Sequence, residues 1–553
     1  MYEVVVYPHG LRLKAEPGAA LSDLLEASGI AIDMPCGGEG VCGKCRVRLR
    51  DVEQPEETMR DALVCQTTID GPLIVEIPET SLLDSSIRVV TDVSFTTGSV
   101  LEIDDDIKDG APLGVAVDIG TTTLATELVD LAKGRAIAVA SRMNPQTAFG
   151  DDVISRIQYA ISTENGRDTL QSRIVDAVDE MIVEMCDKTG KSSTSIGRVV
   201  AAGNTTMQHL FARLDPTSLG GLPFQPASCD AMTLPAAGLF KTPLAPEATV
   251  DVFPVIGGFV GGDTVSCILC RELFAEHERE NDEFVNGPTL LIDIGTNGEI
   301  VLFHEGRRWA TAAAAGPAFE GARIMHGMRA VDGAIEKAVY DPEIRDLHLE
   351  TINAAPIRGI CGSGLLDLAA VLLRIGLLEP SGRLLTKDDA RRGDFSEPIL
   401  SRLVEHDGKA AVRLSPLRHE ESDAEDRPIV LTQQDLRELQ LASGAIRTGC
   451  LVLLAQVELE PSDLAHLYLA GGFGQHIRRR NAQRLGLLPT DVPIERIRFL
   501  GNTALAGARS ALCSRRLWNS LESLARETEQ VDLSAAPDFQ SIFAMSMLFP
   551  ESS

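Results

Sequence analysis

The chain has 553 residues, enough for three or four domains of roughly 150 residues each. It carries 80 acidic against 51 basic side chains, a net charge of −29, which argues against a surface that follows the phosphates of a nucleic acid. No run reaches the roughly 18 uncharged apolar residues of a membrane helix, and no secretory signal begins the chain, so we expect a cytoplasmic protein without a membrane partner.

Residues 2–29 predict two strands and a short helix. YEVVVYP and LRLKA alternate like the strands of a hairpin, and LSDLLEASG is typical of a helix ended by Gly29. Cys36, Cys42 and Cys45 follow in a C-x5-C-x2-C pattern, and Cys65 comes later. This order of strand, strand, helix and cysteine loop is that of a ferredoxin.

Two kinds of metal site compete for these four cysteines. Structural zinc usually takes two closely spaced pairs, whereas a [2Fe–2S] cluster takes three thiolates from one loop and a fourth from elsewhere. The spacing resembles the x5 variants of ferredoxins, so Cys36, Cys42, Cys45 and Cys65 are predicted to bind a [2Fe–2S] cluster, with zinc or inert thiols as alternatives. The other cysteines are expected to be packed thiols without metal: Cys186, Cys229, Cys267, Cys270, Cys361, Cys450 and Cys513.

A linker and then an internal repeat follow. Residues 81–111 lack a sustained period and end in an acidic stretch, which predicts a linker. Residues 114–142 and 289–315 each place an apolar strand before Asp-Ile-Gly-Thr, then a second strand, a tight turn and a third strand. Asp118 in the first copy corresponds to Asp293 in the second. A carboxylate at a strand end can hold the water shell of Mg²⁺, so two facing hairpins are predicted to clamp a triphosphate.

Two amphipathic segments between the copies predict core helices. Residues 150–162 place Val153, Ile154, Ile157 and Ile161 on one face behind a cap at Asp151. Residues 168–190 repeat this pattern, and the segment ends at a glycine.

Further glycine-rich segments follow apolar strands. GNTT (203–206) and GGD (261–263) each stand between an expected strand and a helix, GSG (362–364) stands at an expected helix start, and AGGFG (470–474) follows an expected strand. Residues 496–512 predict a last strand and a helix of small residues. These segments and the paired hairpins resemble the nucleotide-binding segments of the ATPase superfamily that includes actin and the sugar kinases. This resemblance implies that Asp118 and Asp293 are catalytic and that the nucleotide is bound by Gly120, Thr121, Thr122, Gly203, Asn204, Thr205, Gly261, Gly262, Asp263, Gly295, Thr296, Asn297, Gly471, Gly472 and Gly474.

The paired DIGT hairpins and the late AGGFG resemble the ATPase superfamily of actin, sugar kinases and heat-shock chaperones. Joined to a ferredoxin and a linker, the whole chain resembles the reductive activators of corrinoid proteins, as do GNTTMQHL, NPQTAFGDDVISRI and TQQDLRELQLASGAIR. The resemblance implies an α/β and α+β multidomain protein. It would comprise a β-grasp ferredoxin domain (1–80), the linker (81–111), a first RNase H-like lobe or middle domain (112–283), and a second RNase H-like lobe (284–553) with an insertion near 376–430.

This resemblance implies an ATP-hydrolysing enzyme that passes one electron through the cluster to a corrinoid protein, reducing inactive Co(II) to Co(I). It implies ATP and Mg²⁺ as cofactors beside the cluster, a one-electron donor such as a ferredoxin or flavodoxin, and a homodimer. The alternatives are a small-molecule kinase with a regulatory iron–sulfur domain, an activator of a dehydratase or aromatic-ring reductase, and a cytoskeletal or chaperone-like ATPase.

Overall fold

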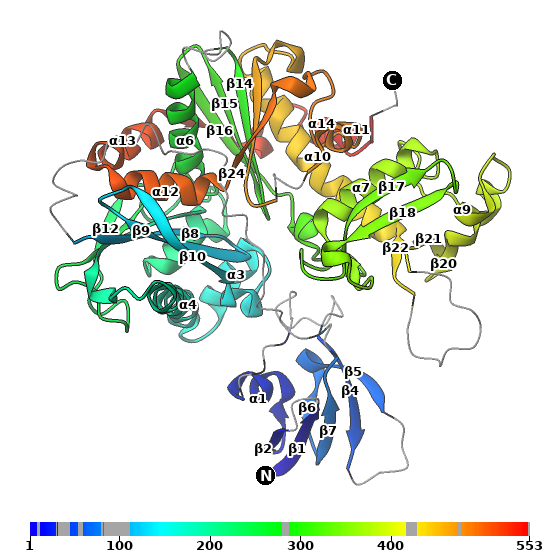
Figure 1. Cartoon of the computed structure of the whole chain (residues 1–553), viewed down its shortest axis with the longest axis horizontal. Helices are drawn as coiled ribbons and strands as arrows, with labels where there is room; N and C mark the ends of the chain where they lie inside the picture. The colour runs from blue at the N-terminus through cyan, green and yellow to red at the C-terminus, as the bar shows by residue number, and fades with distance from the viewer. Residues whose placement is uncertain are drawn as a thin grey trace.

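A computed structural model describes residues 1–7, 11–28, 30, 32, 45–52, 59–78, 81, 111–278, 287–415, 428–473 and 477–550. Cys36, Cys42, Gly29, Gly474 and nearly all of the predicted linker lie outside these residues. Figure 1 shows an N-terminal domain beside a larger body with two lobes.

The N-terminal domain is a mixed sheet with one short helix. β1 and β7 run parallel at its centre, and the β1–β2 hairpin pairs Tyr2 with Ala15, which confirms the predicted hairpin. Val4, Val6, Leu21 and Leu25 are buried between the sheet and the helix. The elements are β1 (Tyr2–Tyr7), β2 (Leu11–Ala15), β3 (Ala19–Ala20), α1 (Leu21–Ala27), β4 (Arg46–Asp51), β5 (Arg60–Leu63), η1 (Val64–Gln66), β6 (Thr68–Ile69) and β7 (Leu73–Glu76), with sheet order β2-β1-β7-β4-β5.

The first lobe is built on a six-stranded sheet of order β10-β9-β8-β11-β13-β12. β8 pairs antiparallel with β9 and parallel with β11, so the predicted hairpin lies at the centre of the sheet. The elements are β8 (Leu113–Ile119), β9 (Thr123–Asp130), β10 (Arg135–Met143), α3 (Val153–Ser162), α4 (Gly166–Thr189), β11 (Ile196–Gly203), α5 (Thr205–Phe211), β12 (Met232–Pro235), β13 (Thr249–Val252) and α6 (Gly262–Glu278).

The second lobe repeats this arrangement in a sheet of order β24-β23-β14-β15-β16-β25. β14 pairs antiparallel with β15 and parallel with β23, as β8 does with β9 and β11, and this confirms the internal repeat. The elements are β14 (Thr289–Ile294), β15 (Gly298–His304), β16 (Arg307–Ala313), α10 (Gln433–Ala455), β23 (His466–Ala470), α11 (Arg479–Arg484), β24 (Ile497–Gly501), α12 (Thr503–Cys513), α13 (Arg515–Arg526), β25 (Thr528–Gln530) and α14 (Phe539–Ser546).

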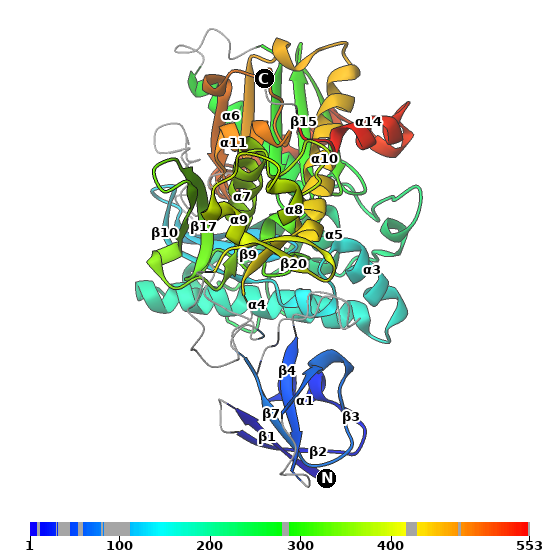
Figure 2. The ribbon, with the colours of Figure 1, turned by 90° about the vertical axis from the view of Figure 1, so that its right-hand side faces the viewer.

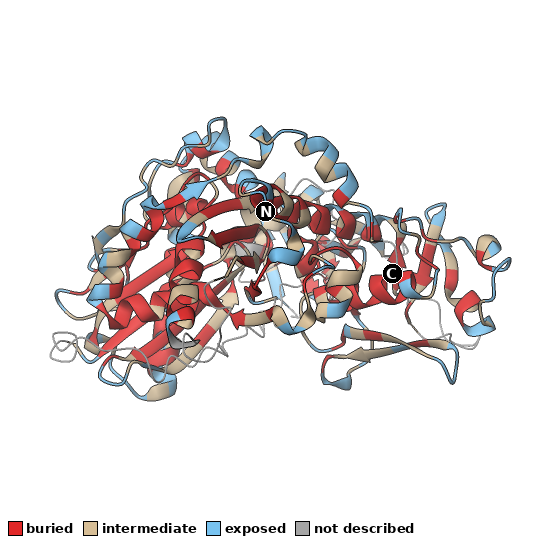
Figure 3. Cartoon of the chain, turned by 90° about the horizontal axis from the view of Figure 1, so that it is seen from above, coloured by how far each residue is buried: buried red, intermediate tan, exposed pale blue. Residues whose placement is uncertain are grey.

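Helices α6 and α12 lie between the two sheets (Figure 1). The Ser266 hydroxyl of α6 donates to the Thr503 carbonyl of α12 at 2.8 Å, and Gly507 lets the two helices approach closely. α12 also packs on β8, where Leu512 lies against Gly114. α12 therefore packs on the sheet of the first lobe, while α6 packs on β14 and β15 of the second, so this pair of helices joins the two sheets, whose strands are buried in Figure 3.

The two amphipathic predictions fared differently. α4 buries Leu170, Ile174 and Met181 and ends at Gly190, as predicted. For α3 the prediction was wrong at the cap, because Asp152 rather than Asp151 accepts the backbone N–H of Ser155. The prediction was also wrong for Ile154 and Ile161, which are exposed. Only a narrow face of this helix packs on the lobe, and the spacing of apolar residues does not show how wide the buried face is.

Helix α10 is the one described helix that is long and apolar enough to cross a membrane. Of the most apolar 18-residue stretch of this helix, 72% is buried within the protein. Leu436, Ile446 and Leu453 belong to the core of the second lobe. A buried core helix meets the same test of length and composition, so α10 is explained by packing.

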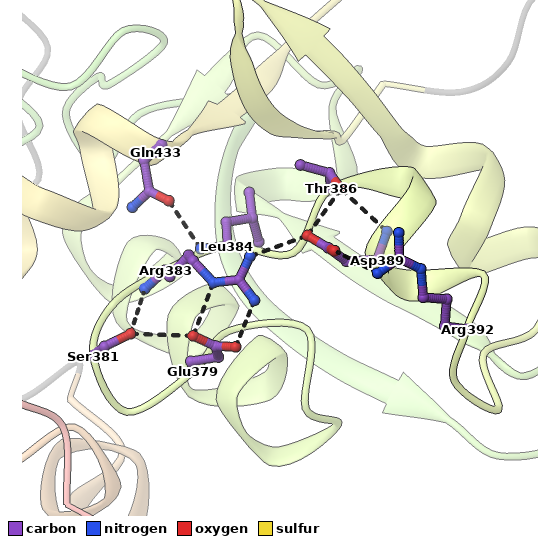
Figure 4. Close-up of polar contacts among 8 residues, drawn as sticks. All are labelled: Glu379, Ser381, Arg383, Leu384, Thr386, Asp389, Arg392 and Gln433. Carbon is purple, nitrogen blue, oxygen red and sulfur yellow. Dashed lines mark hydrogen bonds and ion pairs between the residues drawn. The ribbon is translucent and has the colours of Figure 1, made fainter.

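A subdomain separates β16 from α10 and includes the predicted insertion. Arg383 anchors one of its loops, because the guanidinium binds Glu379 at 2.7 Å and Asp389 at 3.0 Å (Figure 4). Gln433, at the start of α10, accepts the Leu384 N–H at 2.8 Å and so ties this loop to the lobe. The elements are β17 (Ala334–Asp341), β18 (Asp346–Thr351), β19 (Gly359–Ile360), α7 (Gly362–Arg374), α8 (Lys387–Ala390), α9 (Glu397–Arg402), β20 (Leu403–His406), β21 (Lys409–Arg413) and β22 (Val430–Thr432).

Candidate functional site

The loops of the two DIGT hairpins meet between the lobes. Thr122 from the loop after β8 and Thr296 from the loop after β14 bring their hydroxyl oxygens within 3.0 Å of each other. The Glu320 carboxylate accepts a hydrogen bond from each, at 2.5 Å from Thr122 and 2.8 Å from Thr296. Glu320 follows β16 in a short 3-10 turn and was not predicted from the sequence. The two lobes are therefore joined at the predicted phosphate loops by one carboxylate.

Four carboxyl groups lie behind these loops. Burial and, to a smaller extent, the negative charge of Asp293 raise the pKa of Asp118 and of Asp263 to about 7, and burial raises the pKa of Asp293 to about 6. Burial also raises the pKa of Glu299, on β15, well above its ordinary value. Asp118, Asp293 and Asp263 were predicted, whereas Glu299 was missed because an alternating strand pattern gives no sign that this side chain faces a carboxylate cluster.

The donor set of this cluster suits a hydrated cation. Carboxylate oxygens are what Mg²⁺ prefers, and Mg²⁺ usually keeps several waters and takes one or two protein carboxylates. Within the described ranges no three His, Cys, Asp or Glu side chains converge on a single metal position. The residues thus fit an ion held through water and through substrate phosphate rather than a closed protein cage.

A repeated Gly-Asn-Thr at two strand ends supports the first loop. Asn204 begins α5 and Asn502 begins α12, and each side chain accepts a backbone N–H of its own helix. The Asn204 amide also donates to the Thr121 hydroxyl at 2.8 Å, and the Asn502 amide donates to Asp118 at 2.8 Å. Only Asn204 was predicted from the sequence, although GNT at 203–205 and again at 501–503 was a signal for both asparagines.

Two predicted glycines are required by close approach. A Cβ on Gly471, whose φ is +87°, would lie 2.3 Å from the Asp293 carboxylate, and one on Gly261 would lie 2.5 Å from the Asn204 Cα. Gly471 therefore lies directly against the Asp293 carboxylate, and the loop before α6 lies on the start of α5.

Some of the remaining residues predicted to bind the nucleotide form hydrogen bonds that hold nearby loops. The Thr205 hydroxyl donates to the Gly257 carbonyl, and the Gly262 N–H donates to Gln208, so both hold the loop before α6. The Gly295 N–H donates to the Asn297 carbonyl and closes the second DIGT turn. Of the other predicted residues, Gly120 and Gly203 lie at the ends of β8 and β11, Gly472 borders open space, and Gly474 lies outside the described residues.

One packed thiol touches the site. Cys267 is buried, as predicted for all seven cysteines outside the cluster, but its thiol donates to Asp293 with an Sγ–Oδ2 distance of 3.3 Å. Cys229 is exposed, which corrects that prediction: it precedes an exposed Asp and lies on a surface loop.

The raised carboxyl pKa values predict a pH-dependent stability. In Mg²⁺-free protein, the folded state holds a proton on Asp118 up to about pH 7, whereas the unfolded chain releases it near its ordinary 3.8. The free energy of unfolding should therefore fall as pH rises from about 4 to 7. Asp118→Asn should raise stability at pH 8 by a few kcal/mol and change little at pH 4, since one pKa unit corresponds to about 1.4 kcal/mol.

Thermal unfolding in EDTA at pH 4.5 and pH 8 measures this difference. Asp176→Asn, on the outer surface of α4 beside Lys241, is the matched control and should leave the profile unchanged. A parallel pH profile for wild type and Asp118→Asn would contradict the assignment.

The thiols of Cys45 and Cys65 form the described part of the other predicted site. Cys45 immediately precedes β4 and Cys65 lies in η1, and their sulfurs are 3.3 Å apart without a disulfide. Sulfur ligands of one tetrahedral metal with bonds of about 2.3 Å lie a little under 4 Å apart, so the pair fits adjacent ligands of one metal ion. Cys36 and Cys42 lie outside the described residues.

Comparison with known proteins shows the family to which the whole chain belongs. The corrinoid activation enzyme RamQ of Eubacterium limosum is 30% identical to this chain, over 96% of each protein. The chain belongs to the reductive activators of corrinoid proteins. Among other members, the [Co(II) methylated amine-specific corrinoid protein] reductase of Methanosarcina barkeri is 25% identical over 75% of this chain and 72% of its own.

Family descriptions and a solved structure agree with this membership. Residues 4–70 match a 2Fe-2S iron-sulfur cluster binding domain, 113–276 the RACo middle region, and 287–553 the C-terminal domain of RACo, the ASKHA domain. A structure described as reductive activator for corrinoid, iron-sulfur protein superposes with a TM-score of 0.70 at 29% identity, covering 100% of this chain and 99% of that one. These findings confirm the predicted fold class of a ferredoxin domain followed by the lobes of the actin-like ATPase fold.

Proposed function

We propose that this reductive activator uses ATP to drive the transfer of one electron through a [2Fe–2S] cluster to the cobalt of a corrinoid protein, which returns inactive Co(II) to Co(I). The substrate is the cobalt of the partner protein in a methyltransferase system. The names of two relatives, a corrinoid activation enzyme and a Co(II) corrinoid protein reductase, support this proposal.

The observation that carries the proposal is the combination of two sites in one chain. The thiol pair of the N-terminal domain suits an electron carrier, and the loops and carboxylates between the lobes suit a metal-bound triphosphate. When bound, the cluster supplies the electron at low potential. Cys45 and Cys65 would hold it together with Cys36 and Cys42.

The lobe interface offers a means of coupling ATP to the reduction. Thr122 and Thr296 come from different lobes and both bind Glu320, so a triphosphate entering between them must take over their hydroxyl groups. Asp118 and Asp293 would orient the waters of Mg²⁺ behind it. When the triphosphate replaces Glu320 as the partner of Thr122 and Thr296, the contact between the two lobes changes. ATP would therefore bind the open and the closed arrangement of the lobes with different affinities.

The energy required sets a scale for this coupling. For one electron, each tenfold preference of binding for one redox state shifts a potential by about 59 mV. A reduction that is uphill by a few such steps thus needs several kcal/mol of differential binding, which lobe closure on the corrinoid protein would supply.

We further infer the setting in which the reaction runs. The electron would come from a ferredoxin or flavodoxin in the cytoplasm, and the active species would be a homodimer. Neither nucleic acid nor a membrane would take part, in keeping with the net charge of −29.

The test is an anaerobic assay with a Co(II) corrinoid protein and a one-electron donor, followed by the visible absorbance of Co(I). We expect Co(I) to form with MgATP and not with MgADP or without nucleotide. Equal rates under all three conditions would defeat the proposal. Rapid release of ADP that depends on a small-molecule acceptor, without reduction of cobalt, would instead support the kinase alternative.

A further inference from the structure

An open pocket of about 620 Å³ lies between β17, α7, α11 and β24, away from the DIGT loops. Its lining includes five arginines and no carboxylate: Arg374, Arg478, Arg479, Arg480 and Arg484. Val371, Ile477 and Phe499 form its apolar wall. We call it the arginine pocket. In a chain with a net charge of −29, such a concentration of positive charge needs an explanation.

Two of the five guanidinium groups hold the pocket together. Arg478 forms an ion pair at 3.0 Å with Asp367 of α7, whose carboxylate also accepts from Asn481 at 2.7 Å. Arg479 donates to the carbonyls of Ile494 and Ile497 and lies over the Phe499 ring. These contacts fix α11 against α7 and against the edge strand β24; Figure 2 shows α11 beside α7.

The other three guanidinium groups have no carboxylate partner in the part of the chain that the structure describes. Arg480 and Arg484 stand four residues apart on α11, where like charges repel. Burial, and then the positive charge of Arg374, lowers the pKa of Arg484. Arg484 has one side-chain contact, to Asn481 at 3.3 Å. Three cationic groups thus border one pocket against their mutual repulsion, as expected where an anion binds.

The pocket is separate from the nucleotide loops. The first residue of α7, Gly362, lies against Phe319 and Phe473 beside the DIGT loops, whereas Arg374 is the last residue of the helix. The ends of this helix are about 18 Å apart at 1.5 Å per residue. The Asp367, Arg478 and Asn481 contacts cross from α7 to α11 between the two ends.

We propose that the arginine pocket binds a small di- or triphosphate anion. Guanidinium groups bind phosphate through paired N–H donors. Three of them suit an anion with several negative charges better than they suit a ligand with a single carboxylate. The volume lies within the roughly 300–1,000 Å³ of small-ligand sites, and the apolar wall offers room for a non-phosphate portion. This proposal goes beyond the reductive activation proposed above and does not depend on it.

Isothermal titration on the full-length anaerobic protein tests it in two arms. The first titrates a non-hydrolysable MgATP analogue and counts sites per chain, and the second titrates inorganic pyrophosphate after one equivalent of the analogue. We expect the wild type to bind a second equivalent of analogue or one of pyrophosphate. A second analogue site identifies the ligand as a nucleotide, and a pyrophosphate site alone identifies a phosphate compound that needs no base.

Arg374→Ala/Arg484→Ala should weaken that second site at least tenfold, because it removes two charge-assisted hydrogen bonds. Arg480→Ala, at an exposed position, should weaken it with less risk to folding. Arg391→Ala/Arg392→Ala removes two exposed arginines elsewhere and should not change it.

Identical titrations of wild type and Arg374→Ala/Arg484→Ala would overturn the proposal. So would slower electron delivery from an acidic donor protein in that variant with both titrations unchanged, since the pocket would then be a protein docking surface. Neither result contradicts the proposed MgATP dependence of the reduction, because these variants keep Asp118 and Asp293.

Discussion

Replacing Cys65 by serine is expected to remove the [2Fe–2S] cluster and with it the reduction of the corrinoid partner, while ATP hydrolysis continues. The Cys65 sulfur lies 3.3 Å from that of Cys45, so its loss would remove one of two adjacent proposed ligands. The reduction rate should fall by more than the roughly 10–100-fold that loss of an outer-shell partner of a metal site costs. Iron content, the visible spectrum before and after dithionite, and the rate of Co(I) formation measure the effect.

The matched control is Cys229→Ser, the same exchange at an exposed thiol of the first lobe. This variant should keep both iron and activity. If Cys65→Ser retained two irons per chain and the wild-type rate, Cys65 would not be a ligand, and the assignment of the four cysteines would be wrong.

Asp293→Asn is expected to reduce ATP hydrolysis by about 100-fold or more, equivalent to at least about 2.7 kcal/mol in the activation free energy. The amide has the shape of the carboxylate and fits between the Cys267 thiol and Gly471, but it lacks the charge that would hold the waters of Mg²⁺. Release of ADP under anaerobic conditions, with and without the corrinoid protein, gives the rate.

Asp176→Asn serves again as the control, because that carboxylate pairs with Lys241 on the surface. The spectrum of the cluster should be unchanged in Asp293→Asn. Asp293→Asn should thus lose ATP hydrolysis and keep the cluster, whereas Cys65→Ser should lose the cluster and keep ATP hydrolysis. Hydrolysis at the wild-type rate in Asp293→Asn would remove this carboxylate from the catalytic role.

The local elements could be predicted because their signals are local. The strands before Asp118 and Asp293, and the helix starts at Asn204 and Gly362, follow from apolar runs that end in glycine or a capping side chain, and the structure places them there. The cap of α3 was misplaced by one residue because Asp151 and Asp152 are adjacent and either side chain can cap. Only the backbone path into the helix selects Asp152.

The site was predicted less completely than the strands. Glu320, Glu299 and Cys267 carry no motif, since an acidic residue after a strand, an acidic residue within a strand, and a thiol on an apolar helix are all common. Each belongs to the candidate site only through what packs against it, as Cys267 does against Asp293.

By itself, the sequence determined the cysteine spacing, the duplicated hairpin and the order of domains, because these depend on residue type and on short-range periodicity. The tertiary structure decided which groups meet. Asn502 contacts Asp118, 384 residues away in the sequence, and Glu320 contacts Thr122, 198 residues away. These contacts exist because α6 and α12 pack between the sheets of the two lobes and fix their relative position. Such contacts arise from long-range packing of whole elements, and no local pattern in the chain records that packing.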